Sequence, residues 1–498
     1  MKINILFLLF ICSFTSVYAQ DDFEQYRKQA QQEYTGFRDQ SVKEFNDYRD
    51  KANAEFADYV RQSWESFQAF QGIPIPKEPK PVIPPKVEPT PDRKPTIDPV
   101  PFKEIKPLPT VPVVQPQPIA PIPPTPRPVD QPQGAKTSPV KPRFTFSYYG
   151  SEGKVSLDAS HRFLLRDASE NSVADAWETL SDSRYNDLLN DCLTLRKELN
   201  LSDWGYMELL KTMSEKQFGK PCNEAVLMQM FILSQSGYKV RIARIENKLV
   251  LLVPFQETMY QYVYIPINGL NYYVLDKSFK GGQFNVLNHE FPKEQPASLK
   301  ITQPNFPVVA TPTKTFTSKY NRDLRVTVST NKNLIDFYKN YPLSNEWNLY
   351  AQASLSEQLK QDLYPALQQQ IAGKSERDAA NILLQFVQTA FNYQTDEQQF
   401  GYERPLFADE SFFYPANDCE DRSILFANLV KDLLHLDVVL LHYPGHLATA
   451  VHFNETIQGD YLTIKGNKFI VCDPTYTGAS IGMAMPQLKT TSAEVVKV

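Results

Sequence analysis

The stretch NDCEDRS, residues 417–423, is followed directly by the apolar run ILFANLVKDLL. The spacing of the apolar residues in that run predicts a helix whose first turn holds Cys419. The partial positive charge at a helix N-terminus stabilises a thiolate, so the position suits a nucleophilic cysteine. A small buried hydrophobe is the alternative role for a cysteine at this place.

The sequence after this helix predicts two strands joined by a turn. LDVVLLHYPGHLATAVHF, residues 436–453, contains a Pro-Gly pair directly before His446. A strand that follows the helix must run back, so His446 returns to the end where Cys419 lies. A further strand ends at Asp473, just before a proline. An imidazole to take the thiol proton and a carboxylate to orient it are what thiol catalysis needs.

Three other histidines lie in the same region and compete for the role of base. His435 falls in the loop after the helix, His442 at the near end of the first strand and His452 at the far end of the second. Their positions favour His446 as the base, with His442 as its main rival. The structural alternative is a buried cysteine, a turn histidine and an aspartate that ends a strand.

Residues 417–482 resemble a known family in three motifs: NDCEDRSILFANLV, GHLATAVHF and FIVCDPTYTGASIG. They are similar to the core of the transglutaminase-like superfamily of papain-fold cysteine enzymes, and a looser likeness extends back to about residue 345. The family motifs fall on Cys419, His446 and Asp473. The resemblance implies an α+β fold with the cysteine-bearing helix on an antiparallel sheet. It also implies attack on a peptide or amide bond, followed by hydrolysis or acyl transfer, with no cofactor required.

The acidic residues beside the cysteine have two explanations. Asp418, Glu420 and Asp421 suit a helix cap, because carboxylates satisfy free N–H groups and the helix dipole. They also oppose thiolate formation, so Arg422, His446 or a cation must compensate for them. A related group of bacterial periplasmic proteinases holds calcium with a similar DCED string. The resemblance therefore implies a calcium site at the three acids as the alternative to the cap.

The chain contains a second stretch with the same plan, which starts at KPCNEA, residues 220–225. Cys222 precedes a predicted helix, two strands follow, and Asp276 ends a later strand. The separation of 54 positions from Cys222 to Asp276 equals that from Cys419 to Asp473. We therefore expect a duplicated core.

The upstream copy lacks a base. No histidine lies between its cysteine and its aspartate, and the place of His446 falls on Lys248 or Leu249. A lysine serves as a base only when it is strongly desolvated. This copy is therefore predicted to be inactive.

The downstream copy gains a loop in front of its cysteine. FGYERPLFADESFFYPAND occupies residues 400–418, whereas FGKP suffices before Cys222. The loop is predicted to form a substrate wall, with Tyr414 and Asn417 as candidate oxyanion donors. A surface insertion away from the site is the alternative.

The front of the chain divides into three segments. Residues 1–19 combine a lysine, a short apolar run and Val17-Tyr18-Ala19, which predicts a secretory signal and export. Aromatic residues recur every 11 positions in residues 20–71, which predicts a long helix that self-associates or folds back on the body. Residues 72–142 contain 24 of the 39 prolines and are predicted to be a semi-rigid spacer.

The remaining chain is predicted to form two globular domains, residues 143–300 and 301–498. A net charge of −5 excludes a basic nucleic-acid binder, and no apolar run predicts a membrane span. Together these patterns predict an exported cysteine peptidase or amidase. A crosslinking acyltransferase and a non-catalytic cell-envelope binding protein are the alternatives.

Overall fold

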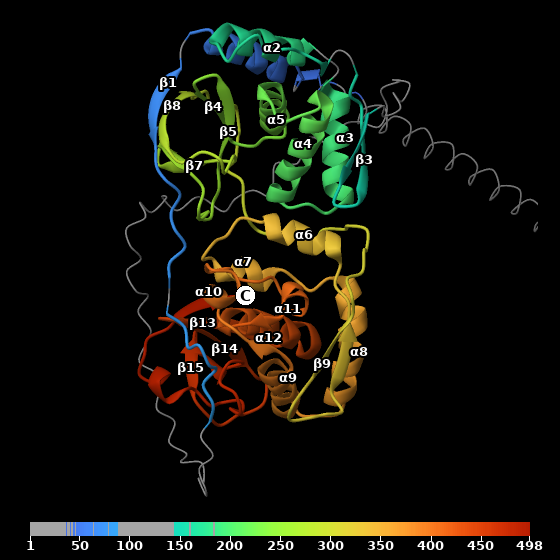
Figure 1. The fold of residues 1–498 in the computed structure, drawn as a ribbon, viewed down its shortest axis with the longest axis vertical. Coiled ribbons are helices and arrows are strands. Elements are labelled where there is room, and N and C mark those ends of the chain that lie inside the picture. Colours follow the sequence, from blue (N-terminus) through green and yellow to red (C-terminus); the bar gives the residue numbers. More distant parts are fainter. Residues whose placement is uncertain are drawn as a thin grey trace, which may run out of the picture.

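The computed structural model describes residues 36, 40, 43, 44, 46–62, 64–77, 79–87, 144–158, 161–182 and 185–498. The predicted signal peptide and most of the proline-rich segment lie outside these residues. Figure 1 shows two stacked units, each built from helices and an antiparallel sheet. The prediction of a mixed α+β chain is confirmed at this level.

The upper unit packs helices against a six-stranded sheet of order β1-β8-β4-β5-β7-β6. Its helices are α2 (Glu170–Asp182), α3 (Tyr185–Glu198), α4 (Asp203–Phe218) and α5 (Asn223–Gln235). A separate hairpin joins β2 (Phe144–Tyr148) to β3 (Ser151–Val155). The sheet strands are β1 (Glu65–Ala69), β4 (Arg241–Ile245), β5 (Lys248–Pro254), β6 (Tyr264–Ile267), β7 (Leu270–Val274) and β8 (Gly282–Leu287).

The lower unit packs helices against a five-stranded sheet of order β15-β16-β14-β13-β17. Its longer helices are α6 (Lys332–Asn340), α7 (Trp347–Gln352), α8 (Glu357–Ile371), α9 (Glu376–Ala390) and α12 (Cys419–Leu434). The sheet strands are β13 (Asp437–Tyr443), β14 (His446–His452), β15 (Tyr461–Ile464), β16 (Asn467–Cys472) and β17 (Glu494–Lys497). Shorter elements are β9 (Lys314–Thr317), β10 (Arg325–Val328), β11 (Asn392–Tyr393), α10 (Asp396–Gln399), α11 (Glu410–Phe413), β12 (Ala416–Asn417) and the 3-10 turn η2 (Pro486–Leu488).

Local sequence signals set the helix boundaries. Ser356 and Ser375 precede α8 and α9, and each hydroxyl accepts a hydrogen bond from a backbone N–H in the first turn. Such caps satisfy donors that have no partner inside the helix. Gly219 ends α4 at a φ of 79°, a conformation that costs glycine little.

The two units repeat the same topology. In the upper unit α5 leads into β4 to β8, whose order in the sheet is β6-β7-β5-β4-β8. In the lower unit α12 leads into β13 to β17, whose order is β15-β16-β14-β13-β17. Each strand of the upper sheet therefore has a counterpart at the same position of the lower sheet, from β4 and β13 to β8 and β17. The upper sheet has one additional edge strand, β1. This agreement supports the predicted duplication.

The hairpin register refines that correspondence. His446 is the first residue of β14 and pairs with Tyr443, and Lys248 is the first residue of β5 and pairs with Ile245. Lys248, rather than Leu249, is therefore the structural counterpart of His446.

The predicted long helix over residues 20–71 needs correction at its C-terminal end. Residues 46–60 are helical, but Glu65–Ala69 forms β1 and pairs antiparallel with β8. The aromatic repeat continues to Phe70 in the sequence, but the backbone hydrogen bonds offered by the edge of β8 outweigh the helical pattern there. The repeat before residue 46 lies almost entirely outside the described residues.

The described part of that helix packs on its own body. Phe56 is fully buried, with its ring 4.2 Å from Trp177 and 4.9 Å from Phe291. Arg61 pairs with Glu178 of α2 at 2.8 Å. Of the two predicted outcomes, the helix that folds back is therefore the one found for residues 46–60. Tyr48 of the same repeat is 51% exposed, and self-association stays a prediction.

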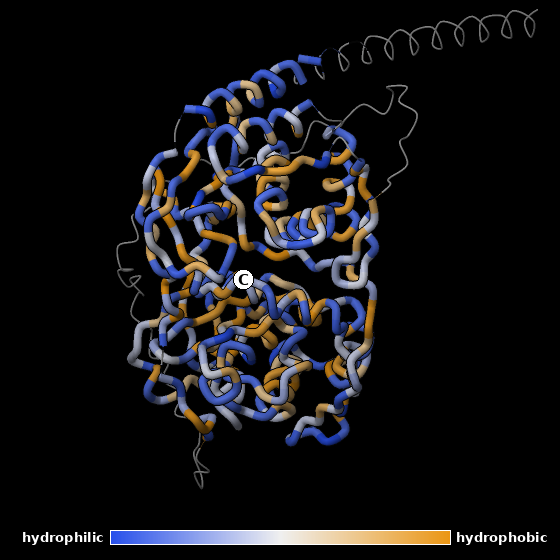
Figure 2. Tube along the Cα trace, turned by 45° about the horizontal axis from the view of Figure 1, so that its top comes forward, coloured by the Kyte–Doolittle hydropathy of each residue, from blue (hydrophilic) through white to orange (hydrophobic). Residues whose placement is uncertain are grey.

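The two units share one continuous apolar core. Figure 2 shows hydrophobic segments inside both halves and largely hydrophilic turns outside. The predicted boundary near residue 300 falls in the connection between the units. Across it Tyr341, just after α6, donates a hydrogen bond to the Leu299 carbonyl at 2.6 Å and packs against Trp204 of α4. None of the helices in the described ranges is long and apolar enough to span a membrane.

The described start of the proline-rich segment is not a free spacer. Residues 71–77 and 79–87, which we call the strap, run from β1 along the lower unit, as the blue trace in Figure 1 shows. The strap ends against the loop after β16, where Val87 N–H donates to the Thr477 carbonyl at 3.1 Å. The spacer prediction is therefore wrong for this stretch and stays a prediction for residues 88–142.

Candidate active site

Cys419 is the first residue of α12 and is 1% exposed. Asp418 and Asp421 form a capping box in front of it, in which Asp418 N–H donates to Asp421 Oδ2 at 3.3 Å. The cap predicted for these two acids is thus present. It fixes the cysteine at the helix N-terminus, with the sheet strand β14 packed against the same helix.

His446 and Asp473 lie together, as the sequence predicted. His446 Nε2 is 2.9 Å from Asp473 Oδ2. The other oxygen, Asp473 Oδ1, accepts hydrogen bonds from the backbone N–H groups of Thr475 at 2.9 Å and Tyr476 at 3.1 Å. The carboxylate is held on both sides, so it can orient the imidazole.

Gln388 of α9 supports this arrangement and was not found from the sequence. Its buried side-chain amide donates to the carbonyls of Asp473, Tyr476 and Ala479 at 2.9–3.1 Å. Its Oε1 accepts from Gly478 N–H at 3.2 Å. This one side chain therefore fixes the whole loop that presents Asp473.

Cys419 and His446 line one cavity of about 70 Å³ at the junction of the two units. The inserted loop contributes Glu403 and Pro405 to its wall, so the loop lies at the site and not on a distant surface; its contact with a substrate stays a prediction. The remaining lining residues come from the strap, the upper unit, the connection into α7 with its first residue, α12 and the β13–β14 hairpin: Ile75, Pro76, Lys80, Tyr260, Leu343, Ser344, Asn345, Trp347, Glu420, His442 and Leu447.

The Cys419 thiol does not contact the His446 imidazole. Cys419 Sγ donates to Glu420 Oε2 at 3.1 Å, and no Cys419–His446 hydrogen bond occurs between these two described side chains. Burial raises the pKa of the thiol well above its usual value, and the Glu420 charge raises it further. Lys80 and the Leu447 backbone N–H act in the opposite direction. These effects together favour the protonated thiol, which donates to Glu420.

The rival histidines occupy different places. His442 also lines the cavity, but its Nδ1 lies 3.7 Å from Glu494 on β17 and its ring packs on Trp347. His435 ends α12 in the left-handed conformation, with a φ of 55°. His452 Nδ1 lies 2.9 Å from the Lys468 carbonyl.

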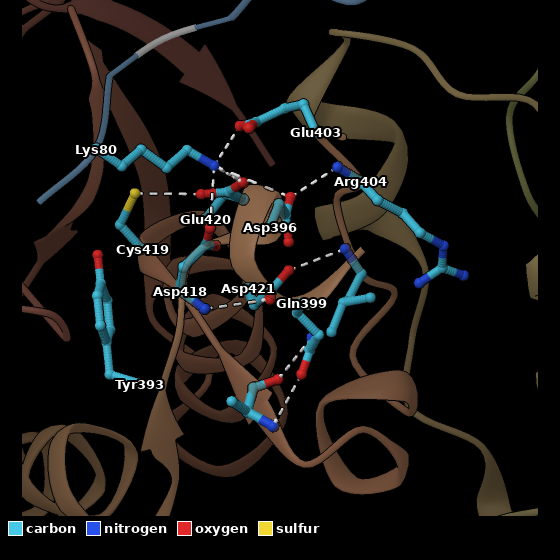
Figure 3. A network of polar contacts seen from close by, with 12 residues as sticks. Lys80, Tyr393, Asp396, Gln399, Glu403, Arg404, Asp418, Cys419, Glu420 and Asp421 are labelled. Carbon is cyan, nitrogen blue, oxygen red and sulfur yellow. Dashed lines mark hydrogen bonds and ion pairs between the residues drawn. The ribbon is translucent and has the colours of Figure 1, made fainter. Parts of the chain in front are cut away.

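The acidic residues around the cysteine converge on Lys80 of the strap (Figure 3). Lys80 Nζ lies 3.0 Å from Asp418 Oδ2 and also contacts Glu420 and Glu403 directly. Asp396 Oδ2 is 4.0 Å away. The lysine side chain is only 6% exposed. The compensating cation that the sequence required is therefore this lysine.

Arg422, the other candidate for compensation, serves a different purpose. Its guanidinium donates to Asn417 Oδ1 at 3.0 Å and to the carbonyls of Gln388 and Phe391 at 3.3 and 3.2 Å. It holds the backbone that precedes α12, together with the end of α9.

Not all of these acids are ionised in the folded chain. Burial raises the pKa of Asp396 to about 10, that of Asp421 to about 8 and that of Glu403 to about 7. Burial acts in the same direction on Glu420, but the Lys80 ammonium outweighs it and lowers that pKa to about 2. At neutral pH the ionised core of the cluster is thus the Glu420–Lys80 pair.

These shifts predict an unusual dependence of stability on pH. Burial also raises the pKa of Asp409, which accepts two hydrogen bonds from Ser356, to about 6. Because the folded chain keeps protons that the unfolded chain releases above its ordinary pKa of 3.8, the stability is complete below that pH and is lost as the pH rises. For Asp409 alone the loss is on the order of 2–3 kcal/mol.

Hydrogen exchange in α8 and α12 checks this prediction. The free energy of opening should fall from about pH 4 to about pH 8, as Asp409, Glu403 and Asp421 lose their protons. Glu420 has the opposite sign, but only below its ordinary pKa of 4.5. An increase of protection across this window would contradict the assignment of protonated buried acids.

Calcium ligation stays a prediction. The described acids form two groups, Asp396 with Glu403 and Glu420, and Asp396 with Asp418 and Asp421; within each group one oxygen per residue lies within 4.8 Å of the others. Asp421 fits less well, because its oxygens accept the N–H groups of Leu406 and Asp418. The Lys80 ammonium contacts the same oxygens, so a cation at the other acids would have to displace it.

The two predicted oxyanion donors lie outside the cavity wall. Tyr414 packs edge-on against Phe400 and beneath the Arg404 guanidinium. Asn417 is fully buried, and its Oδ1 accepts the hydrogen bond from Arg422. The inserted loop thus forms part of the cavity wall and part of the protein core. The side chains of Tyr414 and Asn417 do not line the cavity.

The upper unit has a larger cavity at the position that corresponds to the candidate site. Cys222 is the residue before α5, and with Asp276 it lines a cavity of about 450 Å³. Lys248 is exposed and does not line this cavity. Asp276 Oδ1 accepts Ser278 N–H at 2.8 Å, the same turn that Asp473 makes. The upstream copy retains the frame of the site without a histidine among its described lining residues, and its inactivity stays a prediction.

No protein-family model, curated protein or solved structure matches this chain. The functional argument therefore rests on the geometry of the site itself.

Proposed function

We propose that the lower unit is a cysteine hydrolase of the transglutaminase-like class, which cleaves a peptide or side-chain amide bond through a thioester at Cys419. The observation that carries the proposal is the 2.9 Å contact between Asp473 and His446, where His446 lines the same cavity as Cys419. The upper unit repeats the frame without the histidine, so frame and base are separable features of this chain. Export is part of the proposal and rests on residues 1–19.

The mechanism follows from which nitrogen is free for the thiol. Asp473 occupies Nε2, which leaves Nδ1 of His446 to take the Cys419 proton. The thiolate attacks the carbonyl carbon, and the collapsing intermediate expels the amine, which takes the proton from the imidazolium. Water then attacks the thioester, with the same nitrogen as base, and releases the acid. Sγ must first turn from Glu420 towards His446.

A small activated ester tests the proposal without knowledge of the natural substrate. With p-nitrophenyl acetate, the full chain should release a burst of p-nitrophenolate and carry one acetyl group at Cys419 by peptide mass spectrometry. Cys419→Ala should lose both signals, whereas Cys222→Ala should keep them. Acetylation that is equal at the four cysteines of the described residues, or absent from Cys419, would refute the enzyme and favour the non-catalytic binding protein.

An added amine separates hydrolysis from acyl transfer. If water hydrolyses the thioester, acetate should remain the main product when cadaverine is added. Acetyl-cadaverine as the main product would instead favour the crosslinking acyltransferase.

A further inference from the structure

The strap places a charged side chain in the interior of the candidate site. Lys80 belongs to the sequence Pro79-Lys80-Pro81, yet its side chain is as buried as a core residue, at 6% exposure. Its ammonium meets three carboxylates directly, as Figure 3 shows. A buried lysine is costly unless it is paired, so the pocket and this side chain match each other in charge and size.

Two oxygens of the pocket are left for a ligand from outside. Asp418 Oδ1 and Asp396 Oδ1 are buried and have no hydrogen-bond partner among the described residues. Both carboxyl groups are fully buried. An ammonium carries three donors, so it suits a pocket with several converging oxygens.

The strap is held along its length by backbone contacts on both units. Gln261 N–H of the upper unit donates to the Ile73 carbonyl at 2.9 Å, and Thr477 N–H of the lower unit donates to the Pro85 carbonyl at 2.9 Å. Between them Tyr393 Oη donates to the Pro81 carbonyl at 2.9 Å. Ile75 and Pro76 form part of the cavity wall.

The turn in front of His446 is shaped for this close approach. Gly445 has a φ of 72°, and a Cβ built on it would lie 2.6 Å from the Pro79 carbonyl oxygen. A glycine is needed there because the backbone is left-handed and because a Cβ would collide with the Pro79 carbonyl oxygen. The chain therefore crosses the cavity directly beside the hairpin that carries the base.

We propose that the acidic pocket formed by Asp396, Glu403, Asp418 and Glu420 is a binding site for the ammonium group of a lysine side chain, and that the strap occupies this site as an intramolecular ligand. The strap must leave before an external chain can enter. The substrate that competes for the site is then an extended, lysine-bearing peptide. This last step rests on the function proposed above.

The pocket recognises the ammonium as a cation and not as a nucleophile. Burial lowers the pKa of Lys80, but the charges of Glu420 and Asp418 outweigh it and raise that pKa well above its usual value. A protonated amine has no lone pair for attack on a thioester. The lysine is therefore a recognition element that lies beside Cys419, distinct from the acyl acceptor of a crosslinking reaction.

Hydrogen exchange reports on the strap without any turnover. The amides of Gln261 and Thr477 donate to strap carbonyls, so both become exchangeable when the strap leaves. Lys80→Met should speed their exchange at least tenfold, because the carboxylates lose their partner and hydrate. Lys77→Met is the matched control, since Lys77 is 78% exposed and pairs only at the surface with Glu397. It should leave both amides protected.

A charge-balanced variant covers the case in which Lys80→Met unfolds the lower unit. Lys80→Met combined with Glu420→Gln removes the pair that is ionised at neutral pH, one charge of each sign, and it should release the strap while α12 stays protected. Equal exchange in this variant, Lys77→Met and the wild type would overturn the proposal. So would equal acceleration by both lysine substitutions, because the effect would then not depend on the pocket.

A synthetic peptide tests the recognition itself. The peptide of residues 71–87, added to the Lys80→Met chain, should restore protection at Thr477. The same peptide with methionine at the position of Lys80 should fail to do so. Equal protection by both peptides would overturn ammonium recognition. Failure of these tests would leave the Cys419 acetylation assay unaffected, so the two proposals stand or fall separately.

Discussion

Replacement of His446 by alanine is expected to slow the acetylation of Cys419 by a factor of about 10²–10⁴, the usual contribution of a positioned general base. The thiol is buried beside Glu420, and both features raise its pKa. Without an imidazole to take the proton, the fraction of thiolate at neutral pH is very small. The measurement is the burst rate with p-nitrophenyl acetate across pH.

The matched control is His442→Ala. His442 lines the same cavity but faces Glu494 and Trp347, so its loss should change the rate by less than about threefold. Asp473→Asn should behave like His446→Ala but fold normally, because an amide no longer selects the imidazole tautomer. If His442→Ala abolished the burst and His446→Ala did not, the assignment of the base would be reversed.

The sequence predicted the parts of the site that depend on short-range connections. Cys419, His446 and Asp473 belong to one helix and the strands that follow it, so chain direction alone brings the first two to the same end. The repeat from Cys222 to Asp276 was visible for the same reason. Its strand order and hairpin register then identified Lys248 as the counterpart of His446.

The strap could not be predicted in this way. Lys80 lies 338 positions before Asp418, and nothing in the proline-rich composition marks it apart from Lys77 or Lys86. Composition describes the average behaviour of a segment, which is extended and without a core. An extended chain is also the form that fits a cleft between two units, and only tertiary contacts decide between these outcomes.

Two local misassignments have the same origin. Glu65–Ala69 continues an 11-residue helical repeat but forms β1, because the edge of β8 offers backbone partners. Tyr414 lies near Cys419 in sequence and was expected in the cavity. Instead, Arg404 and Phe400 hold its ring against the inserted loop.

Replacement of Arg422 by methionine is expected to destabilise the lower unit by about 3–5 kcal/mol. The guanidinium is 1% exposed and donates to Asn417 Oδ1 and two backbone carbonyls. Methionine fills much of the volume but leaves these buried acceptors without donors. The loss is large because each unsatisfied buried acceptor costs about 1–3 kcal/mol.

Hydrogen exchange resolved by helix measures the effect within one molecule. Protection in α12 and α9 should fall by the full amount, because Arg422 connects these two helices through Gln388 and Phe391. Protection in α5, on the upper unit, should fall less. Arg322→Met is the matched control, since that arginine is exposed, and it should change protection by less than about 0.5 kcal/mol. An equally small effect of Arg422→Met would mean that water replaces the guanidinium. The backbone before Cys419 would then be held by the Asp418–Asp421 capping box alone.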